Sequence, residues 1–595
     1  IDTEGLYPKV YHIDTNAQTA TDMEAEKTET GDVAVATDHF SMYDISLVAA
    51  SELSSTIGKD TFQAGGEYKL TDDVQTDENI GQVTITKDTT IDLNGHTLTI
   101  SKANQCFVVE SGTLTIQDSQ APEEKPVTPG DGGKLYGNKA TLENDILTYY
   151  ITKSTADGTG TTETLEKHEV PLANAGKILC KEGSYQAIAI KVETDGTLEL
   201  QSGVLQGTGV KHIVYVEDGT LNVSGGYIVG GGSDAPGGGI YVTSGAENGK
   251  ANIQGGVVAA NRGDFGGGIY VESGTLNISG GAVTGNEVID GHEDNGGGIY
   301  VSRGTLNLSG NGYVTNNCKK CDCEVCQGDK NNTHGGGGIA LANGTTMNMS
   351  GGYVTGNYSS LAGGGIYAGF FAGDGGVNFS MTGGTIASNC ARYGEGGGLR
   401  IGGGTHGVIR ATDRVYITNN KTLTTDDWGG GGIFVQQNGN LSVLDALITN
   451  NKADGFGGGV GACPTGETLI VNEDGAAIYR NTAKGVQMSG GGNGKTYDTT
   501  LAKTSEVFTK NGYADYFCVR GKNDANNYIS LVTGLMAGGG AANWKGSCDE
   551  QPVSIGPSGY AAAKYLFGLN AHPDEAAKTQ AVSAAKVIIT GNYSG

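Results

Sequence analysis

The sequence predicts an all-β chain folded as a right-handed parallel β-helix, a solenoid with loop insertions, and two observations lead to this expectation. The first is composition: of 595 residues, 103 are glycine and only 10 are proline. A disordered linker is rich in both, and a collagen-like chain has glycine at every third position, but neither pattern is present. The second is repetition, which accounts for a length beyond the size at which single globular cores stop growing.

Strand motifs recur along the middle of the chain. Gly-Gly-Gly-Ile-Tyr-Val begins at Gly237, Gly266 and Gly296, about 30 residues apart. Variants begin at Gly336, Gly363, Gly396, Gly430 and Gly457. Each period also holds a second strand of the form Gly-Thr-Leu-Asn and a third of the form Tyr-Val-Thr, so each coil is expected to have three strands. Apolar and polar residues alternate in them, which places Ile, Val and Leu inside the bore and Thr, Ser and Tyr outside.

An asparagine occupies the same place in successive second strands. The positions are Asn222, Asn277, Asn307 and Asn348. Stacked side-chain amides can hydrogen-bond along a solenoid axis, so these residues predict a ladder that satisfies backbone groups at the bends.

The repeats also predict the limits of the solenoid. Residues 1–52 are expected to form a partial small β-module, residues 62–483 the β-helix, and residues 484–595 less regular coils. A surface insertion interrupts the solenoid at about 120–178, where Pro, Lys and Thr replace the strand pattern. Residues 574–585 read as a short helix, because acidic residues stand in its first turn. Both chain ends resemble cuts through a longer protein, so signal and anchor segments are expected outside this sequence.

The charge narrows the classes of partner. Asp and Glu number 65 against 38 Lys and Arg, a formal net charge of −27, which repels nucleic acid and anionic membranes. No apolar stretch is long enough for a membrane-spanning helix, so no direct membrane insertion is expected within this sequence. The expected location is extracellular, either secreted or anchored to the cell wall, and the expected partners are glycans or host glycoproteins.

Three short motifs carry a resemblance. Residues 37–43 (TDHFSMY) resemble the closing strand of a small β-module in large surface proteins of Gram-positive gut bacteria. Residues 92–96 (DLNGH) look like the first coil of their β-helices, and residues 567–571 (FGLNA) look like a spacer before further repeats. The resemblance implies a member of the pectate-lyase-like right-handed β-helix superfamily, which includes polysaccharide lyases, pectin-type hydrolases and lacto-N-biosidases. The last have two Asp residues seven apart, and the only such pair here is Asp322 and Asp329.

A candidate site comes from the loops that precede the glycine-rich strands, since these loops should stack at the coil spacing of roughly 4.8 Å. Carboxylates recur there with aromatic residues beside them, a combination that suits a sugar site. The predicted catalytic residues are Glu395, Asp427 and Asp454, and the predicted substrate-binding residues are Tyr393, Arg400, Trp428 and Phe456. The competing interpretation, which the composition of the solenoid favours, is that these Asp residues only cap bends before glycine.

A cysteine cluster marks the longest period, between Gly296 and Gly336. Cys318, Cys321, Cys323 and Cys326 have the spacing C-x2-C-x-C-x2-C within a loop at 318–334. Paired C-x2-C units suit a structural Zn²⁺ ion, and an exported protein can equally form two local disulfides. No cofactor is required by any motif, although clustered carboxylates also leave a structural Ca²⁺ ion open.

These observations leave two functions of different class. The first is a surface adhesin or glycan-binding rod, which is favoured because no motif in the sequence requires catalysis. The second is an extracellular glycoside hydrolase with paired carboxylates beside the β-helix, of the lacto-N-biosidase type or another. A polysaccharide lyase is a minor third alternative, because Arg392, Arg400, Arg410 and Arg414 lie near the candidate site.

Overall fold

The computed structural model describes most of residues 50–462. Gaps stand at 101–105, 128–133, 157–160, 181–187, 289–295, 320–334, 371–374 and 425–428, with a few shorter ones. Outside 50–462 it describes mainly the backbone of separate strands. The expected helix at 574–585 lies outside the described residues.

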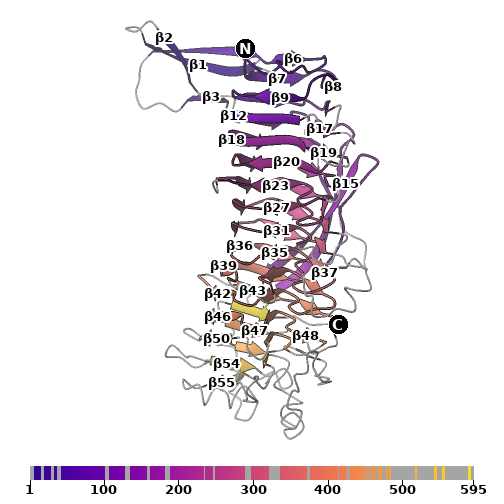
Figure 1. The fold of residues 1–595 in the computed structure, drawn as a ribbon, viewed down its shortest axis with the longest axis vertical. Coiled ribbons are helices and arrows are strands. Elements are labelled where there is room, and N and C mark those ends of the chain that lie inside the picture. The colour runs from indigo at the N-terminus through magenta and orange to yellow at the C-terminus, as the bar shows by residue number, and fades with distance from the viewer. Residues whose placement is uncertain are drawn as a thin grey trace.

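A stack of parallel coils forms the body of the molecule (Figure 1). One coil contains β20 (His212–Glu217), β21 (Thr220–Val223) and β22 (Tyr227–Val229), and the next contains β23 (Ile240–Thr243), β24 (Lys250–Ile253) and β25 (Val257–Ala259). Each strand pairs in parallel with its equivalent one coil later. The prediction of an all-β parallel β-helix is therefore confirmed.

Later coils repeat the same three rows. The first row continues with β27 (Ile269–Val271), β31 (Ile299–Val301), β35 (Ile339–Leu341), β38 (Ile366–Ala368), β41 (Leu399–Ile401), β45 (Ile433–Val435) and β49 (Val460–Ala462). The second continues with β28 (Thr275–Ile278), β32 (Thr305–Leu308), β36 (Thr346–Thr355), β39 (Asn378–Ala387), β42 (His406–Arg410), β46 (Asn440–Leu444) and β50 (Glu467–Val471). The third contains β29 (Ala282–Thr284), β33 (Tyr313–Thr315), the second halves of β36 and β39, β43 (Val415–Thr418), β47 (Ala446–Thr449) and β51 (Ala477–Tyr479).

A fourth row of two-residue strands adds to the three expected per coil. Its members are β26 (Arg262–Gly263), β30 (Glu287–Val288), β34 (Cys318–Lys319), β37 (Tyr358–Ser359), β40 (Cys390–Ala391), β44 (Lys421–Thr422), β48 (Lys452–Ala453) and β52 (Thr482–Ala483). These strands are too short to show the alternation by which strands are recognised in a sequence.

The N-terminal coils have the same parallel pairing. They contain β6 (Ser51–Leu53), β7 (Gly66–Leu70), β8 (Val74–Gln75), β9 (Gln82–Ile85), β10 (Thr89–Asp92), β11 (Thr97–Ile100), β12 (Cys106–Gln117), β17 (Lys177–Cys180), β18 (Ile188–Leu200) and β19 (Val204–Gly207). Because β6 already pairs in parallel with β7, the solenoid begins ahead of Phe62. Before it, β1 (Leu6–Asp14), β2 (Thr19–Met23) and β5 (Met42–Ala49) form an antiparallel sheet, and β3 (Ala25–Lys27) pairs with β4 (Val33–Val35).

The remaining described strands follow the last regular coils. They are β53 (Tyr516–Cys518), β54 (Ala542–Lys545), β55 (Pro552–Ile555) and β56 (Val587–Thr590). The last of them pairs in parallel with both β43 and β47, so residues near the end of the sequence lie within the third row.

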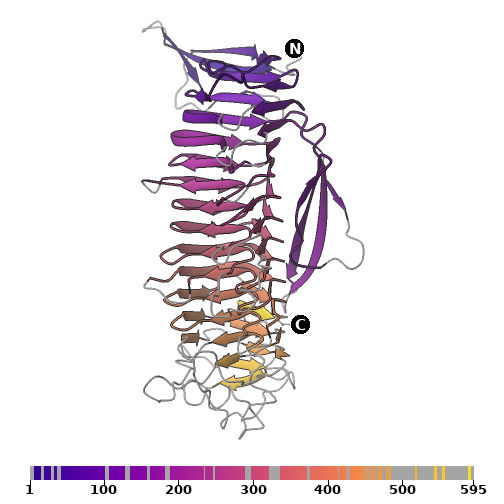
Figure 2. The same cartoon turned by 45° about the vertical axis from the view of Figure 1, so that its right-hand side comes forward.

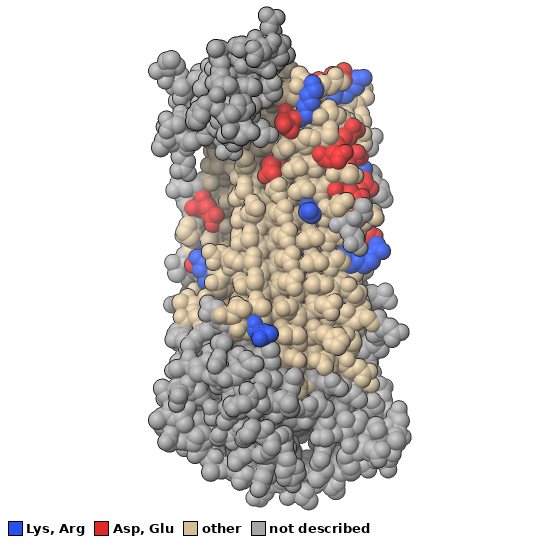
Figure 3. All heavy atoms as spheres, turned by 90° about the vertical axis from the view of Figure 1, so that its left-hand side faces the viewer, with Lys and Arg blue, Asp and Glu red and all other residues tan. Residues whose placement is uncertain are grey.

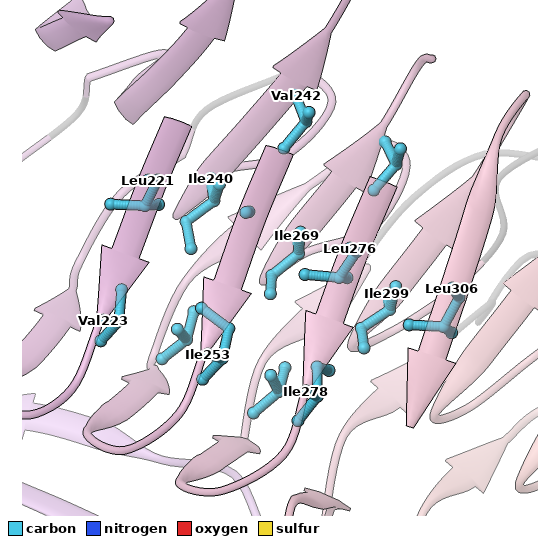
Figure 4. Close-up of a cluster of buried hydrophobic side chains, with 14 of the residues drawn as sticks. Leu221, Val223, Ile240, Val242, Ile253, Ile269, Leu276, Ile278, Ile299 and Leu306 are labelled. Carbon is cyan, nitrogen blue, oxygen red and sulfur yellow. The ribbon is translucent and has the colours of Figure 1, made fainter. Parts of the chain in front are cut away.

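Inward side chains stack along the bore (Figure 4). Ile240, Ile269 and Ile299 occupy one inward position of successive coils, and Leu276 and Leu306 occupy another; all are fully buried. Burial of one such side chain contributes roughly 1.5–3 kcal/mol. Repeating this contact in every coil gives the continuous core on which the solenoid depends.

Two asparagine ladders run along the axis. The predicted one exists and also includes Asn252: the Nδ2 group of each residue donates to the Oδ1 atom of the previous one at 2.7–2.9 Å. It lies on the outward side of the second row, however, so the expectation that it serves the bends is wrong. The bend ladder is a buried set that follows the third row: Asn261, Asn286, Asn317, Asn357, Asn389 and Asn420. The residue immediately before each of these asparagines has a positive φ; examples are Ala260, Asn316 and Gly356.

The insertion between β12 and β17 forms an antiparallel sheet of β13 (Lys125–Val127), β14 (Thr141–Glu143), β15 (Ile146–Ala156) and β16 (Thr161–Pro171). We call the described residues of this insertion, mainly 134–175, the arm. Figure 2 shows the arm lying lengthwise beside the coils. The two ends of the whole insertion meet where the Gly176 amide donates to the Asp118 carboxylate at 2.7 Å.

Candidate functional site

Glu395 and Arg400 of the predicted site lie together inside the protein. Arg400 Nε donates to Glu395 Oε1 at 2.9 Å, and both side chains are fully buried. The Gln436 side chain also donates to Glu395 Oε1 at 3.0 Å, and Arg400 donates to the Gly369 carbonyl at 2.8 Å. The guanidinium lies 4.4 Å from the centre of the Tyr367 ring. This geometry neutralises a buried charge, and a substrate in solvent does not reach either group in this conformation.

The other predicted residues are not brought to this pair. Asp454 is buried, but it directly follows β48, whereas Glu395 directly precedes Gly396, so the two carboxylates occupy different places in their coils. Tyr393 is half-buried, and the Arg392 guanidinium lies 4.7 Å from the centre of its ring. Asp427, Trp428 and Phe456 lie outside the described residues, so a site that includes them stays a prediction.

The cysteine cluster is described only at its first member. Cys318 lies in β34 and is 1% exposed, while Cys321, Cys323 and Cys326, like Asp322 and Asp329, lie outside the described residues. Within the described part of the chain, no group of three or more His, Cys, Asp or Glu side chains has a geometry that could hold a metal ion. Zinc or disulfides at 318–326 and a structural calcium ion stay predictions.

A row of tyrosines, which we call the tyrosine row, occupies the outward position of the first row of strands. Tyr215, Tyr241, Tyr270 and Tyr300 stand in register on β20, β23, β27 and β31. Successive ring centres are 5.0, 5.0 and 5.5 Å apart. The first three rings are half-buried, so edges and hydroxyl groups remain accessible on this side of the solenoid.

Carboxylates stand two residues beyond the outward position in three of these coils: Glu217 after Tyr215, Glu272 after Tyr270, and Glu193 after Lys191, which pairs with Tyr215. Glu193, Glu217 and Glu272 are 37%, 45% and 37% exposed in their side chains. Glu272 accepts hydrogen bonds from the Tyr241 hydroxyl at 3.0 Å and from the Thr243 hydroxyl at 2.7 Å. Glu272 therefore orients the Tyr241 hydroxyl, and the three carboxylates remain partly exposed to solvent.

Two cations accompany these carboxylates. Lys191 Nζ lies 2.8 Å from Glu193 and 2.6 Å from Glu217, and Arg303 lies 3.8 Å from Glu272. Burial opposes the charge of Lys191, but hydrogen bonds to Glu193 and Glu217 outweigh it and raise the pKa of the ammonium group. The pKa of Tyr241 is also raised, by burial and by its bond to Glu272. Lys191 therefore stays charged and Tyr241 stays neutral at neutral pH.

Some of these residues line an open groove of about 480 Å³. Glu193, Glu217 and Tyr215 form one part of it, and Ser244, Ser273 and Arg303 form another. Figure 3 shows acidic side chains, with basic ones among them, gathered along one edge of the upper half of a face on which other charged groups are scattered singly. The groove thus offers hydroxyl, carboxylate and guanidinium groups beside aromatic edges, which is a surface for a polar ligand.

Sequence reasoning placed these tyrosines on the outer surface but did not select them. A usable signal was present, because Tyr241, Tyr270 and Tyr300 hold the same place in three consecutive copies of one motif. The carboxylates gave no such signal: Glu193 and Glu217 lie in coils that lack the motif, and Glu272 alone follows it.

Comparison with known proteins does not assign a function to this groove. No family model matches the chain. A search of curated proteins finds no match either. Within the described residues, no helix is long and apolar enough to cross a membrane. The fold and the groove therefore carry the functional argument.

Proposed function

We propose that this chain is part of an extracellular bacterial surface protein that binds glycans or glycoproteins through one face of its β-helix. The groove beside Tyr215 carries the proposal, because it combines hydroxyl and carboxylate groups with an aromatic side chain. Sugars offer hydroxyl groups for hydrogen bonding and apolar ring faces for aromatic contact, so this set of side chains suits them.

The shape and charge of the surface also favour binding of a neutral glycan over a polyuronate. Glu193, Glu217 and Asp218 bring three carboxylates to the groove against the single guanidinium of Arg303, and the whole chain carries a charge of −27. Like charges repel a polyanion, so an uncharged saccharide has the smaller electrostatic cost.

Burial of Glu395 favours binding over hydrolysis. A glycosidase needs two carboxyl groups that contact the scissile bond, one as acid and one as nucleophile or base. Glu395 is enclosed by Arg400 and Gln436, and Asp454 is buried elsewhere in its coil. A glycoside hydrolase remains the second candidate through Asp427, and the experiment below separates the two.

The test is a glycan array probed with the wild-type chain and with two groove variants, Tyr215→Ala and Glu217→Gln. We expect binding to a set of neutral glycans and a loss of about tenfold in affinity for each variant, the effect of about 1.4 kcal/mol at a contact residue. Tyr313→Ala is a matched control, since Tyr313 stacks on Tyr353 at 4.5 Å in the third row, away from the groove.

Three results would count against the proposal. Equal loss in the control variant would mean that tyrosine stacking only maintains the fold. Binding that survives both groove substitutions would place the ligand elsewhere. Release of a saccharide product, abolished by Asp427→Asn, would establish the hydrolase in its place.

A further inference from the structure

The arm contacts the solenoid through hydroxyl groups on three successive coils. The Thr284 hydroxyl donates to the Tyr150 carbonyl at 2.5 Å, and the Thr355 hydroxyl donates to the Thr152 carbonyl at 2.6 Å. Between them, the Thr152 amide donates to the Thr315 hydroxyl at 3.2 Å. A short stretch of β15 is thus bonded to β29, β33 and β36 at once.

A second line of contacts follows the bends after the third row. The Ala140 amide donates to the Gly285 carbonyl at 3.2 Å, and the Gly137 amide donates to the Gly356 carbonyl at 2.8 Å. The Asn138 side chain donates to Asn316 Oδ1 at 2.7 Å. Two of these bonds are accepted by backbone carbonyls of the bends, and the third by the Asn316 side chain.

The contacts extend well beyond these coils. Near the base of the arm, Leu147, Tyr149 and Val170 pack with Val204 and Val229 in one buried cluster. At the far end, the Asn419 side chain donates to the Thr161 carbonyl at 3.3 Å, across 258 residues of sequence. One inserted segment therefore touches coils from β19 to the bend after β43.

This pattern departs from the usual energetics of a solenoid. In a solenoid each coil contacts only its neighbours, so destabilisation of one coil affects distant coils only through the interfaces between neighbouring coils. We propose that the arm is a lateral clamp that joins the coils between β19 and β43 into one cooperative unit, and that Gly285 and Gly356 set the position at which it docks. The clamp is independent of any ligand of the groove.

The two glycines point to this role because the arm approaches them closely. A Cβ atom on Gly285 would lie 2.3 Å from the Ala140 amide nitrogen, and one on Gly356 would lie 2.4 Å from Thr152 Oγ1. All the nearest atoms in both cases belong to the arm. Other coils have Asn316 and Asn419 at the equivalent bend with the same positive φ, so the backbone itself tolerates asparagine. Only the arm excludes a side chain at these two positions.

The test compares Gly285→Asn and Gly356→Asn in two backgrounds: the complete chain, and a chain in which a short Gly-Ser linker replaces residues 122–174. In the complete chain each substitution should lower the thermal midpoint and reduce amide protection across β29 to β43 by about tenfold, equivalent to about 1.4 kcal/mol. In the linker background the same substitutions should leave the midpoint unchanged or raise it, because asparagine restricts the unfolded chain more than glycine does.

Destabilisation of equal size in both backgrounds would overturn the proposal, since it would trace to the bend itself. An unchanged midpoint in the complete chain would also overturn it. If the linker chain does not fold, Thr152→Val in the complete chain replaces that test. This change removes the hydroxyl that donates to the Leu135 carbonyl at 2.8 Å and accepts from Asn316 at 3.0 Å, without altering any coil. Loss of protection as far as β43 supports the clamp, and loss confined to the coils of Asn316 and its neighbours refutes it.

Discussion

Acidification should loosen the solenoid through one buried histidine. His212 is 1% exposed in β20, where its ring lies 4.7 Å from the Tyr241 ring and its Nδ1 atom lies 3.1 Å from the Gly237 carbonyl. Burial lowers the pKa of His212 from 6.5 to about 4, against a smaller opposite effect of the Gly237 carbonyl. The folded state therefore holds this imidazole neutral over a range in which the unfolded chain protonates it.

The sign and size of the effect follow from this difference. Because the pKa is lower in the folded protein, the stability that His212 contributes is complete above pH 6.5 and is lost as the pH falls toward 4. The whole loss is about 3 kcal/mol, since one pKa unit corresponds to about 1.4 kcal/mol. Between pH 7 and pH 5 the loss is about 2 kcal/mol.

The assay is urea unfolding of the wild-type chain and of His212→Gln at pH 7, 6 and 5. Glutamine retains a donor for the Gly237 carbonyl but does not titrate, so the variant should lose about 2 kcal/mol less than the wild type over this range. His406→Gln, at an exposed position in β42, is the matched control and should follow the wild type. Parallel pH profiles of wild type and His212→Gln would refute the reasoning.

Three further predictions concern the residues selected from the sequence. Arg400→Met should destabilise the fold by about 3–5 kcal/mol in urea unfolding, because it leaves the Glu395 carboxylate buried without its cation; a double variant with Glu395→Gln should recover part of this, and no recovery would contradict the pairing. If Trp428 is the platform of a sugar site, Trp428→Ala should weaken glycan binding on an array while Asp427→Asn leaves it intact; if Asp427 is catalytic, its substitution should lower turnover about a hundredfold or more. If zinc holds residues 318–326, metal analysis of chelator-free protein should find about one equivalent with metal–sulfur distances near 2.3 Å, whereas an intact mass with two disulfides there would exclude zinc.

The fold was predictable because each coil repeats a local pattern. Alternation of apolar and polar residues in strands such as β21 and β28 can be recognised within the strand itself. The asparagine that follows the leucine of each strand can be recognised in the same way. Asn252 escaped notice because its strand reads Lys-Ala-Asn-Ile, where the alternation persists but the motif does not. The bend ladder was also present in the sequence, as an asparagine two residues after the third strand in each coil from β25 to β43.

The arm was predictable as an insertion but not as a docked sheet. Its contacts join Thr152 to Thr355 and Thr161 to Asn419, pairs separated by 203 and 258 residues. No local pattern encodes such pairs. Glycine at a bend is expected in any solenoid. The role of Gly285 and Gly356 in docking can therefore be recognised only from the structure, in which the arm packs against them.

The burial of Glu395 and Arg400 has a physical cause in the tyrosine row. In the outward position of the first row, Tyr270 is half-buried, Tyr300 is 7% exposed and Tyr367 is 1% exposed, because Phe265 and Phe370 pack against this part of the row. Arg400 occupies the next place in the same row, fully buried, and a buried guanidinium needs a carboxylate beside it.

Glu395 supplies that carboxylate from the same coil. A carboxylate near the first row of strands therefore has opposite roles at the two ends of that row. Toward the C-terminal coils it neutralises a cation inside the protein, and toward the N-terminal coils, at Glu193 and Glu217, it faces solvent. Burial along the row, which no single coil encodes, decides where a ligand can bind, and it directs the search for one to the coils of β18 to β27.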